Sequence, residues 1–265
     1  MAYRKLTYHF KNSIEHEYHH KGRYGAKGEK RQPKKEVTKE QIALQNQRNR
    51  ENRMRRLIKA NFEEDDLWVG LQYPEGTRKA LASVKMDLRK FLTRMRRLYK
   101  KMGIPFKFVY RIEIGERGGI HVHVLFNRER QGPHPDLLAK SCWPHGPLNY
   151  KSIYEYGGYA ALAWYIVKLP QDDETLGQLS LFDKKEQSSL IRYSSSRNLV
   201  RPKPEEKKYK NRTMRKIIEE GPKATEGFYI DKNSIVQGIN PYTGTSYLCY
   251  IEYRNDVLPW DKGIP

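Results

Sequence analysis

Residues 106–126 read FKFVYRIEIGERGGIHVHVLF and contain two stretches of alternating apolar and polar side chains, separated by a glycine-containing turn. Alternation with a period of two is typical of β-strands that bury one face. The two isoleucines of the first stretch must share that face with Ile120 and Val122 of the second. Pairing Ile112 with Val122 and Ile114 with Ile120 leaves a loop of five residues. The stretch therefore predicts an antiparallel hairpin with one apolar face.

The same register brings polar side chains of the two strands together on the other face. His121 and His123 project from it, with Glu113 directly opposite His121 and Arg111 opposite His123. Directly opposite residues have Cβ atoms ~4.5–5.5 Å apart, so the Glu113 carboxylate can complete a site of three ligands with the histidines. Such a mixed site suits Mn²⁺ or Mg²⁺ bridging a phosphate, or zinc. The alternative is two half-exposed histidines, one of them hydrogen-bonded to Glu113.

The composition indicates a polyanion as the partner. The chain has 265 residues, a net charge of +20 and a mean hydropathy of −0.90. A pI near 9.8 favours nucleic acid over a membrane or an acidic substrate. No apolar run approaches the ~18 residues of a membrane span, and the N-terminus has no apolar stretch of signal-peptide length. We therefore expect a cytoplasmic protein, neither integral to a membrane nor secreted.

The two cysteines, Cys142 and Cys249, are too few for a disulfide framework, which fits a reducing compartment. A zinc site built from Cys142, His145 and distant ligands is a further alternative.

The charge is concentrated at the N-terminus. Residues 1–60 hold 17 Lys and Arg against 6 Glu, a local charge of +11. We predict a basic arm over residues 1–61, partly disordered where the sequence is rich in Gly and Lys. Thr38 and Gln41 resemble a capping box, and they predict a basic helix over about 38–60. This arm is either a solvated segment or a contact to DNA.

The rest of the chain divides into two parts. Residues 62–170 form the predicted globular domain, and 171–265 form an extension with a loop and a hairpin between Phe228 and Tyr253. Within the domain, apolar residues recur at steps of three and four from Leu81 to Met102, which predicts a helix with a basic opposite face.

A second helix is predicted over Gly158 to Lys168. Tyr165 and Lys168 are three residues apart and share one face, with Ala161 one turn earlier. A phenol of pKa ~10 is a poor nucleophile, so a neighbouring ammonium group that stabilises the phenolate or holds a phosphate is useful. The alternative is an amphipathic helix whose aromatic side chains pack on the sheet, with Lys168 as an ordinary cation of the last turn.

The order of these features resembles the HUH endonuclease superfamily. The similarity is greatest to rolling-circle replication initiators of phages and plasmids related to the filamentous-phage gene II replication protein. It covers Leu67 to Lys168, and RIEIGERGGIHVHVLFN and YIVK are its specific parts. SCWPHG resembles the family's Trp-His-Gly loop, and YSSSRNL resembles a stretch that follows the catalytic domain in this group.

The resemblance implies an α+β fold, an RRM-like or ferredoxin-like central antiparallel sheet flanked by helices. It also implies a divalent metal, Mg²⁺ or Mn²⁺, held by His121, His123 and Glu113. Tyr165, assisted by Lys168, would attack a DNA phosphate, form a 5′-phosphotyrosine link and free a 3′-OH primer. Some relatives carry a second tyrosine where this chain has Ala161, so the resemblance implies an enzyme with a single tyrosine. Tyr159 lies nearby on another face.

The partners implied are single-stranded or origin DNA and no membrane, in the cytoplasm of a bacterial host. No G-x-x-x-x-G-K-[ST] motif occurs, so a host helicase would unwind the DNA for a host polymerase. Alternatives are an HUH transposase or mobilisation relaxase, and a non-catalytic RRM-like nucleic-acid-binding protein. The last would carry stacking aromatic residues at the sheet centre, where this chain has Glu and His.

Overall fold

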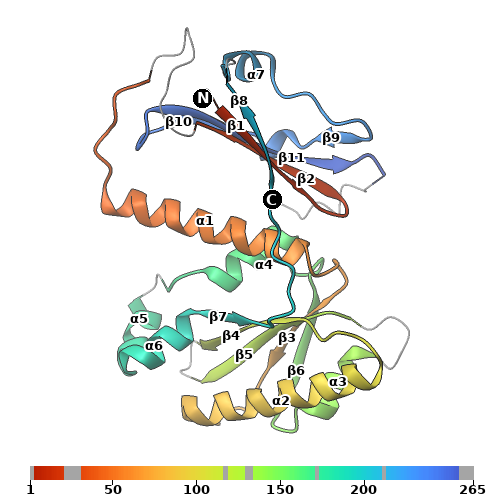
Figure 1. Ribbon diagram of the computed structural model, residues 1–265. Helices are drawn as coiled ribbons and strands as arrows, with labels where there is room; N and C mark the ends of the chain where they lie inside the picture. The colour runs from red at the N-terminus through yellow and green to blue at the C-terminus, as the bar shows by residue number, and fades with distance from the viewer. Residues whose placement is uncertain are drawn as a thin grey trace. The chain divides into compact units, whose positions relative to one another are not determined.

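The computed structural model describes residues 3–20, 31–115, 119–128, 134–170, 173–210 and 213–256, and the chain divides into two compact units (Figure 1). The terminal unit comprises residues 1–46 and 201–259. The central unit comprises residues 47–200 and the last six residues. Each unit contains its own antiparallel sheet, and the predicted α+β class is confirmed.

The central unit contains a sheet of five antiparallel strands in the order β6-β3-β5-β4-β7. Their bounds are β3 (Leu67–Leu71), β4 (Phe108–Ile114), β5 (Ile120–Phe126), β6 (Leu148–Ser152) and β7 (Tyr193–Ser195). The β4–β5 hairpin has the predicted register, with Ile112 opposite Val122 and Glu113 opposite His121. Residues 116–118 of its loop lie outside the described residues.

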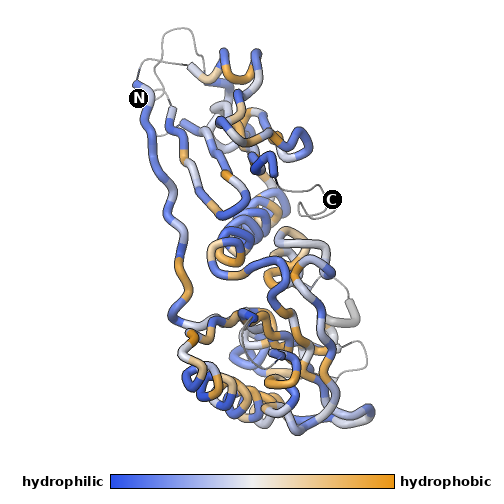
Figure 2. The backbone as a smooth tube through the Cα atoms, turned by 90° about the vertical axis from the view of Figure 1, so that its right-hand side faces the viewer, coloured by the Kyte–Doolittle hydropathy of each residue, from blue (hydrophilic) through white to orange (hydrophobic). Residues whose placement is uncertain are grey.

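Helices cover both faces of this sheet (Figure 1). On one face lie α2 (Leu81–Lys101) and α3 (Pro135–Cys142). Figure 2 shows orange and blue alternating around the turns of α2, as expected for a helix that buries one stripe and exposes a basic one. On the other face lie α4 (Gly158–Val167) and the end of α1 (Lys39–Lys59). The remaining helices, α5 (Asp173–Ser180) and α6 (Lys184–Ile191), pack near β4.

The strand parity divides the apolar residues between two cores. Ile112 and Val122 face α2, whereas Val109 and Leu125 face α4. Ile166 of α4 and Ile58 of α1 are fully buried in the second core. Burying such a side chain contributes about 1.5–3 kcal/mol, so this core fixes α4 on the face that carries Glu113 and the histidines.

The terminal unit contains a second antiparallel sheet, built from both ends of the chain. Its order is β10-β11-β2-β1-β8, and β9 also pairs with β11. The bounds are β1 (Tyr3–His9), β2 (Ser13–His19), β8 (Glu205–Tyr209), β9 (Phe228–Ile230), β10 (Val236–Asn240) and β11 (Thr245–Arg254), with α7 (Arg215–Glu220) and the 3₁₀ turn η1 (Lys232–Ser234).

This arrangement differs from the expected basic arm and separate extension. Glu15 of β2 pairs with Ile251 of β11, and Thr7 of β1 pairs with Glu205 of β8. Charged residues and histidines in β1 and β2 weaken the apolar alternation that signals a strand, and the pairing partners lie in the distant C-terminal part of the chain. The Gly/Lys-rich stretch predicted to be disordered falls largely on residues 21–30, outside the described residues.

Two local expectations for this part of the chain match the structure. Thr38 Oγ1 accepts from the Gln41 amide at 3.3 Å, and Gln41 Oε1 accepts from the Thr38 amide at 3.2 Å, a capping box at the start of α1. A hairpin joins β10 to β11, with Asn240 opposite Thr245. Among the described residues, no helix combines the length and apolar character needed to span a bilayer.

Candidate metal and tyrosine site

The β4–β5 hairpin gathers the three predicted metal ligands. Glu113 Oε2 lies 3.3 Å from His123 Nε2 and 3.9 Å from His121 Nε2. All three ligand atoms lie within 4.8 Å of one another. The carboxylate is buried, and the side chains of His121 and His123 retain 28% and 17% of their exposure. The site therefore opens toward solvent on the histidine side.

Helix α4 brings Tyr165 to the same point. Its hydroxyl donates to Glu113 Oε2 in a short hydrogen bond and lies 3.2 Å from His123 Nε2. The phenol oxygen is therefore adjacent to two of the three ligands, although Tyr165 lies 42 positions beyond His123 in the chain. The structure brings together four of the five residues expected from the sequence through their polar atoms.

Lys168 completes the set in a different way. It lies just beyond the end of α4, and its ammonium group sits over the Tyr165 ring, 4.3 Å from the centroid. This is a cation–π contact, which places a positive charge against the face of the aromatic ring. Lys168 also lies 5.8 Å from the ring centroid of Trp164.

Arg111 joins the strand site to the end of α4. Its Nε lies 2.9 Å from Glu113 Oε1 in an ion pair that is almost fully buried. Its terminal nitrogen donates to the carbonyl oxygens of Tyr165, Ile166 and Lys168 at 2.8–3.0 Å. These carbonyls belong to the last turn of α4, where no intrahelical donor remains. One guanidinium therefore fixes both the carboxylate and the helix that carries the phenol.

Aromatic rings support the other side of the site. Trp68 of β3 stacks on His123 with a centroid distance of 5.2 Å and meets Tyr165 edge-on at 5.8 Å. Tyr156 packs edge-on against Tyr165 at 5.5 Å. Gly70 lies opposite His123 in the β3–β5 pairing, and a Cβ at this position would be 3.6 Å from the imidazole ring. The His123 ring is thus held between Trp68 and the neighbouring strand.

Burial makes His123 a neutral imidazole. Desolvation lowers its pKa to about 4, and the attraction of Glu113 only partly opposes this effect. A neutral imidazole has a free nitrogen lone pair and is the form that binds metals. Together with the Glu113 oxygen and His121, it forms a donor set that fits a divalent cation.

The same environment keeps the Tyr165 phenol protonated. Desolvation, and then the charge and hydrogen bond of Glu113, raise the pKa of Tyr165 well above its usual value of ~10, while Arg111 lowers it to a smaller extent. A bound cation at Glu113 would offset part of that negative charge. The tyrosine is therefore a nucleophile whose activation depends on what neutralises Glu113.

Other residues considered in the sequence lie elsewhere. The Tyr159 hydroxyl donates to the Phe62 carbonyl at 3.1 Å, so it is held by backbone away from the ligands. His145 pairs with Asp87 at 3.4 Å. In the described part of the chain, a single group of acidic, His or Cys side chains has three ligand atoms this close, and it includes neither Cys142 nor His145.

The family comparison agrees with the location of this site. Residues 66–170 match a family model described as a replication-associated protein of the ORF2 type. The match contains Glu113, His121, His123, Tyr165 and Lys168, and it supports a role in replication and therefore binding to DNA. Neither curated proteins nor solved structures gave a significant match.

Two residues of the site were not assigned a role from the sequence. Arg111 shares the strand parity of Glu113 and was placed opposite His123, so the signal for its position was present in the register. Its bonds to α4 could not be read, because they depend on how the helix ends. Trp68 lies on a strand that reads as apolar throughout, LWVGL, and alternation alone does not show which of its residues faces the histidines.

Proposed function

We propose that the chain initiates replication by cutting one DNA strand, with Tyr165 as the nucleophile. The observation that carries this proposal is the position of the Tyr165 hydroxyl, which contacts Glu113 and His123 on the face where these residues and His121 can hold one cation. The family match supports the replication role, and the net charge of +20 fits a DNA substrate.

The proposed reaction transfers one phosphodiester bond to the protein. The phenol oxygen of Tyr165 forms a bond to the phosphorus atom, and the bond from phosphorus to the 3′ oxygen breaks. The phenol proton passes to Glu113 Oε2, which already accepts its hydrogen bond, and a proton from solvent completes the 3′-OH. The products are a 5′-phosphotyrosine link and a 3′ end that can prime synthesis.

Each remaining residue has a defined part in this scheme. Glu113, His121 and His123 would hold Mg²⁺ or Mn²⁺, which when bound supplies Lewis-acid stabilisation of negative charge on the phosphate. Lys168 lies over the Tyr165 ring and stabilises the phenolate as it forms. Arg111 holds Glu113 and the end of α4 in register. A host helicase and polymerase would act on the nicked strand.

A covalent-adduct assay tests the nucleophile. The full chain is incubated with Mn²⁺ and single-stranded oligonucleotides that tile the replicon encoding it, and adducts are detected on denaturing gels. We expect an adduct with the native chain and with Tyr156→Phe, a matched change 5.5 Å away in the same aromatic group. Tyr165→Phe should form none while binding DNA equally well. An adduct with Tyr165→Phe would overturn the assignment.

The same assay separates a nuclease from a nucleic-acid binder. Adding a chelator should abolish the adduct without changing affinity for the oligonucleotide. An RRM-like binder would form no adduct with any oligonucleotide and would be indifferent to chelator, and that result would overturn the proposed function. Whether the chain acts at an origin, at a transfer site or in transposition follows from which oligonucleotides are cut.

A further inference from the structure

A cationic pocket lies on the opposite face of the central sheet from Glu113. Tyr110 and Ile112 of β4 line it, and they alternate with Arg111 and Glu113, which face α4. The pocket has a volume of about 500 Å³, within the range of ~300–1,000 Å³ typical of small-molecule sites. It shares no lining residue with the metal and tyrosine site.

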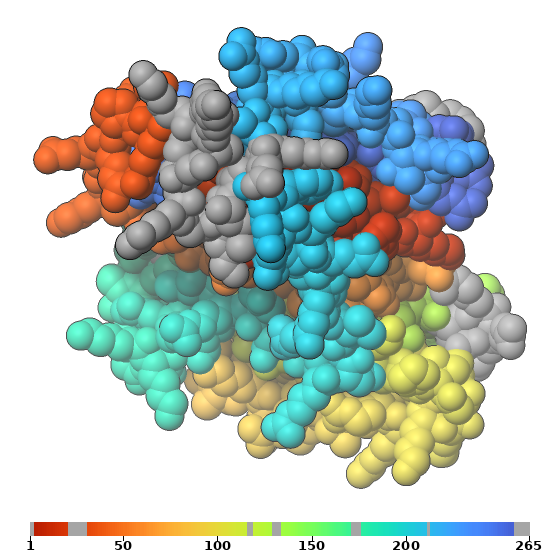
Figure 3. Space-filling view, turned by 45° about the horizontal axis from the view of Figure 1, so that its top comes forward, coloured from red at the N-terminus to blue at the C-terminus, as the bar shows by residue number. Residues whose placement is uncertain are grey.

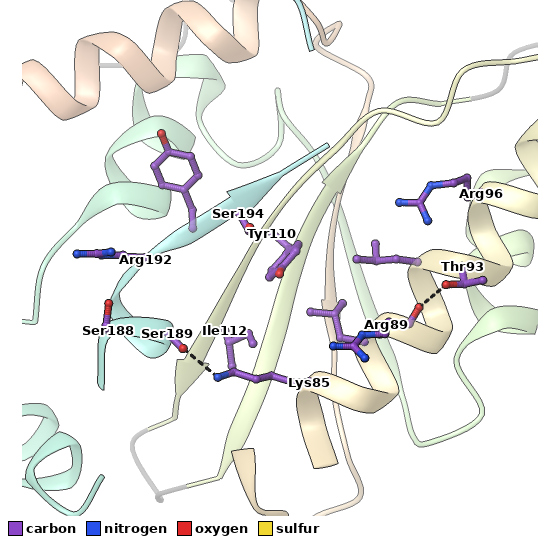
Figure 4. A pocket seen from close by; sticks show the side chains of 13 residues that line it. Lys85, Arg89, Thr93, Arg96, Tyr110, Ile112, Ser188, Ser189, Arg192 and Ser194 are labelled. Carbon is purple, nitrogen blue, oxygen red and sulfur yellow. Dashed lines mark hydrogen bonds between the residues drawn. The ribbon is translucent and has the colours of Figure 1, made fainter. Parts of the chain in front are cut away.

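Two walls of the pocket come from distant parts of the sequence (Figure 4). Helix α2 supplies Lys85, Arg89 and Arg96 on one side, and Arg192 approaches from the end of α6 on the other. Lys85 Nζ donates to Ser189 Oγ at 2.9 Å and ties the walls together. In the space-filling view the side chains of α5, α6 and α2 reach the surface on the same face (Figure 3).

The charge of this pocket is not compensated. Its lining contains four cations and no carboxylate among the described residues. None of Lys85, Arg89, Arg96 or Arg192 forms an ion pair within the described part of the chain. Gathering four like charges around one hollow costs electrostatic energy, which an anionic ligand would recover.

The floor of the pocket is apolar and aromatic. Leu88, Leu92 and Ile112 are buried beneath the cations, and the half-buried ring of Tyr110 lies between the two walls (Figure 4). Hydroxyl groups of Thr93 and Ser194 add hydrogen-bonding capacity. Cations at the rim and a flat apolar floor match a phosphate attached to a planar base.

We propose that this pocket binds a nucleotide through its phosphate, with the base against Tyr110. The nucleotide is either free or one unit of a single strand, since both present the same phosphate and base. This site goes beyond the nicking chemistry and does not depend on it. Arg89 and Arg192 contact the phosphate from opposite walls.

Binding is measured on the full chain carrying Tyr165→Phe, in the presence of a chelator, so that strand cleavage plays no part. One probe is dTMP, followed by calorimetry, and the other is a labelled single-stranded 12-mer, followed by anisotropy. Arg89→Gln combined with Arg192→Gln removes two pocket charges. Lys90→Gln combined with Arg97→Gln removes two charges from α2 outside the pocket and serves as the matched control.

We expect the pocket pair to weaken binding about tenfold, because each arginine loses charge-assisted hydrogen bonds, and the control pair to weaken it less than about twofold. For the 12-mer, the dependence of log K on log salt should fall by about 1.4 for two lost phosphate contacts. Tyr110→Leu, which keeps an apolar floor without the ring, should weaken binding about fivefold or more.

The two probes identify the source of the phosphate. Loss of dTMP binding supports a free nucleotide, and loss confined to the 12-mer supports a phosphate of the strand. The proposal is overturned if neither probe distinguishes the pocket pair from the native chain, or if the control pair loses as much affinity. The adduct assay is a separate measurement, so failure of the nicking function leaves this result readable.

Discussion

Arg111 is the residue on which the geometry of the tyrosine site depends most. Its guanidinium is buried, pairs with Glu113 and donates to three carbonyls at the end of α4. Arg111→Met would leave the Glu113 carboxylate buried without its cation and the helix end without a donor. Breaking a buried pair from one side costs about 3–5 kcal/mol, so we expect the free energy of unfolding of the central unit to fall by about 3 kcal/mol.

This loss can be measured by urea denaturation followed through tryptophan fluorescence, because Trp68, Trp143 and Trp164 all lie in the central unit. Lys90→Met, at an exposed position of α2, is the control and should change the unfolding free energy by less than about 0.5 kcal/mol. In a Glu113→Gln background, Arg111→Met should cost clearly less, because the buried charge is gone. Equal costs in both backgrounds would show that the ion pair is not the cause.

At the scale of elements, the start of α4 sets where Tyr165 lies. Gly157 has φ of +100° and Gly158 has φ of +85°, conformations that side chains with a Cβ rarely adopt. A Cβ on Gly157 would also lie 3.3 Å from the Ala161 Cβ. We therefore expect Gly157→Ala to destabilise the central unit by about 1–2 kcal/mol.

The matched change is Gly177→Ala in α5, where the glycine is helical and a Cβ would meet nothing within 4 Å. Alanine is the better helix former by about 1 kcal/mol, so this variant should be as stable as the native chain or more stable. Thermal unfolding of the two variants compares them directly. A loss of stability in both would point to a general intolerance of added side chains and would contradict the explanation from φ.

Elements with local signals were predictable from the sequence, and elements that depend on distant partners were not. The hairpin of β4 and β5 follows from alternation, and its register fixed the positions of Glu113 and the histidines. Helix α2 follows from an apolar stripe that runs along its whole length. In contrast, β7 is short and exposed, and its residues Tyr193–Ser195 join the sheet only because β4 offers an edge. The pocket beside it was therefore not predictable.

At the scale of the whole molecule, the terminal unit shows why the ends of the chain were harder to interpret. Its sheet buries charged and polar residues, among them Glu15, His16 and Glu252, at positions where a strand pattern predicts apolar side chains. Their pairing is only possible once β2 and β11 lie side by side. The basic character of residues 1–60 remains, but much of it is carried by strands and a helix rather than by an extended arm.

One consequence of this burial is a dependence of the terminal unit on pH. Desolvation lowers the pKa of His16 to about 4; Lys5 adds to this effect, whereas Glu252, 3.4 Å away, opposes it. The unfolded histidine has a pKa of ~6.5, so between pH 6.5 and 4 the unfolded state binds a proton that the folded state does not. The contribution of His16 to stability is therefore complete above pH 6.5 and is lost as the pH falls, at up to about 1.4 kcal/mol per pH unit.

Hydrogen exchange followed by mass spectrometry measures this loss locally, through peptides from β2 and β11. Protection of these strands should decrease from pH 7 to pH 5 in the native chain, beyond the known change in intrinsic exchange rate. His16→Gln removes the titrating group, so its protection should depend less on pH, whereas His134→Gln, at an exposed position of the central unit, should behave as the native chain does. If His16→Gln retains the full pH dependence, another group of the terminal unit causes it, and His19, whose pKa burial also lowers, is the next to test.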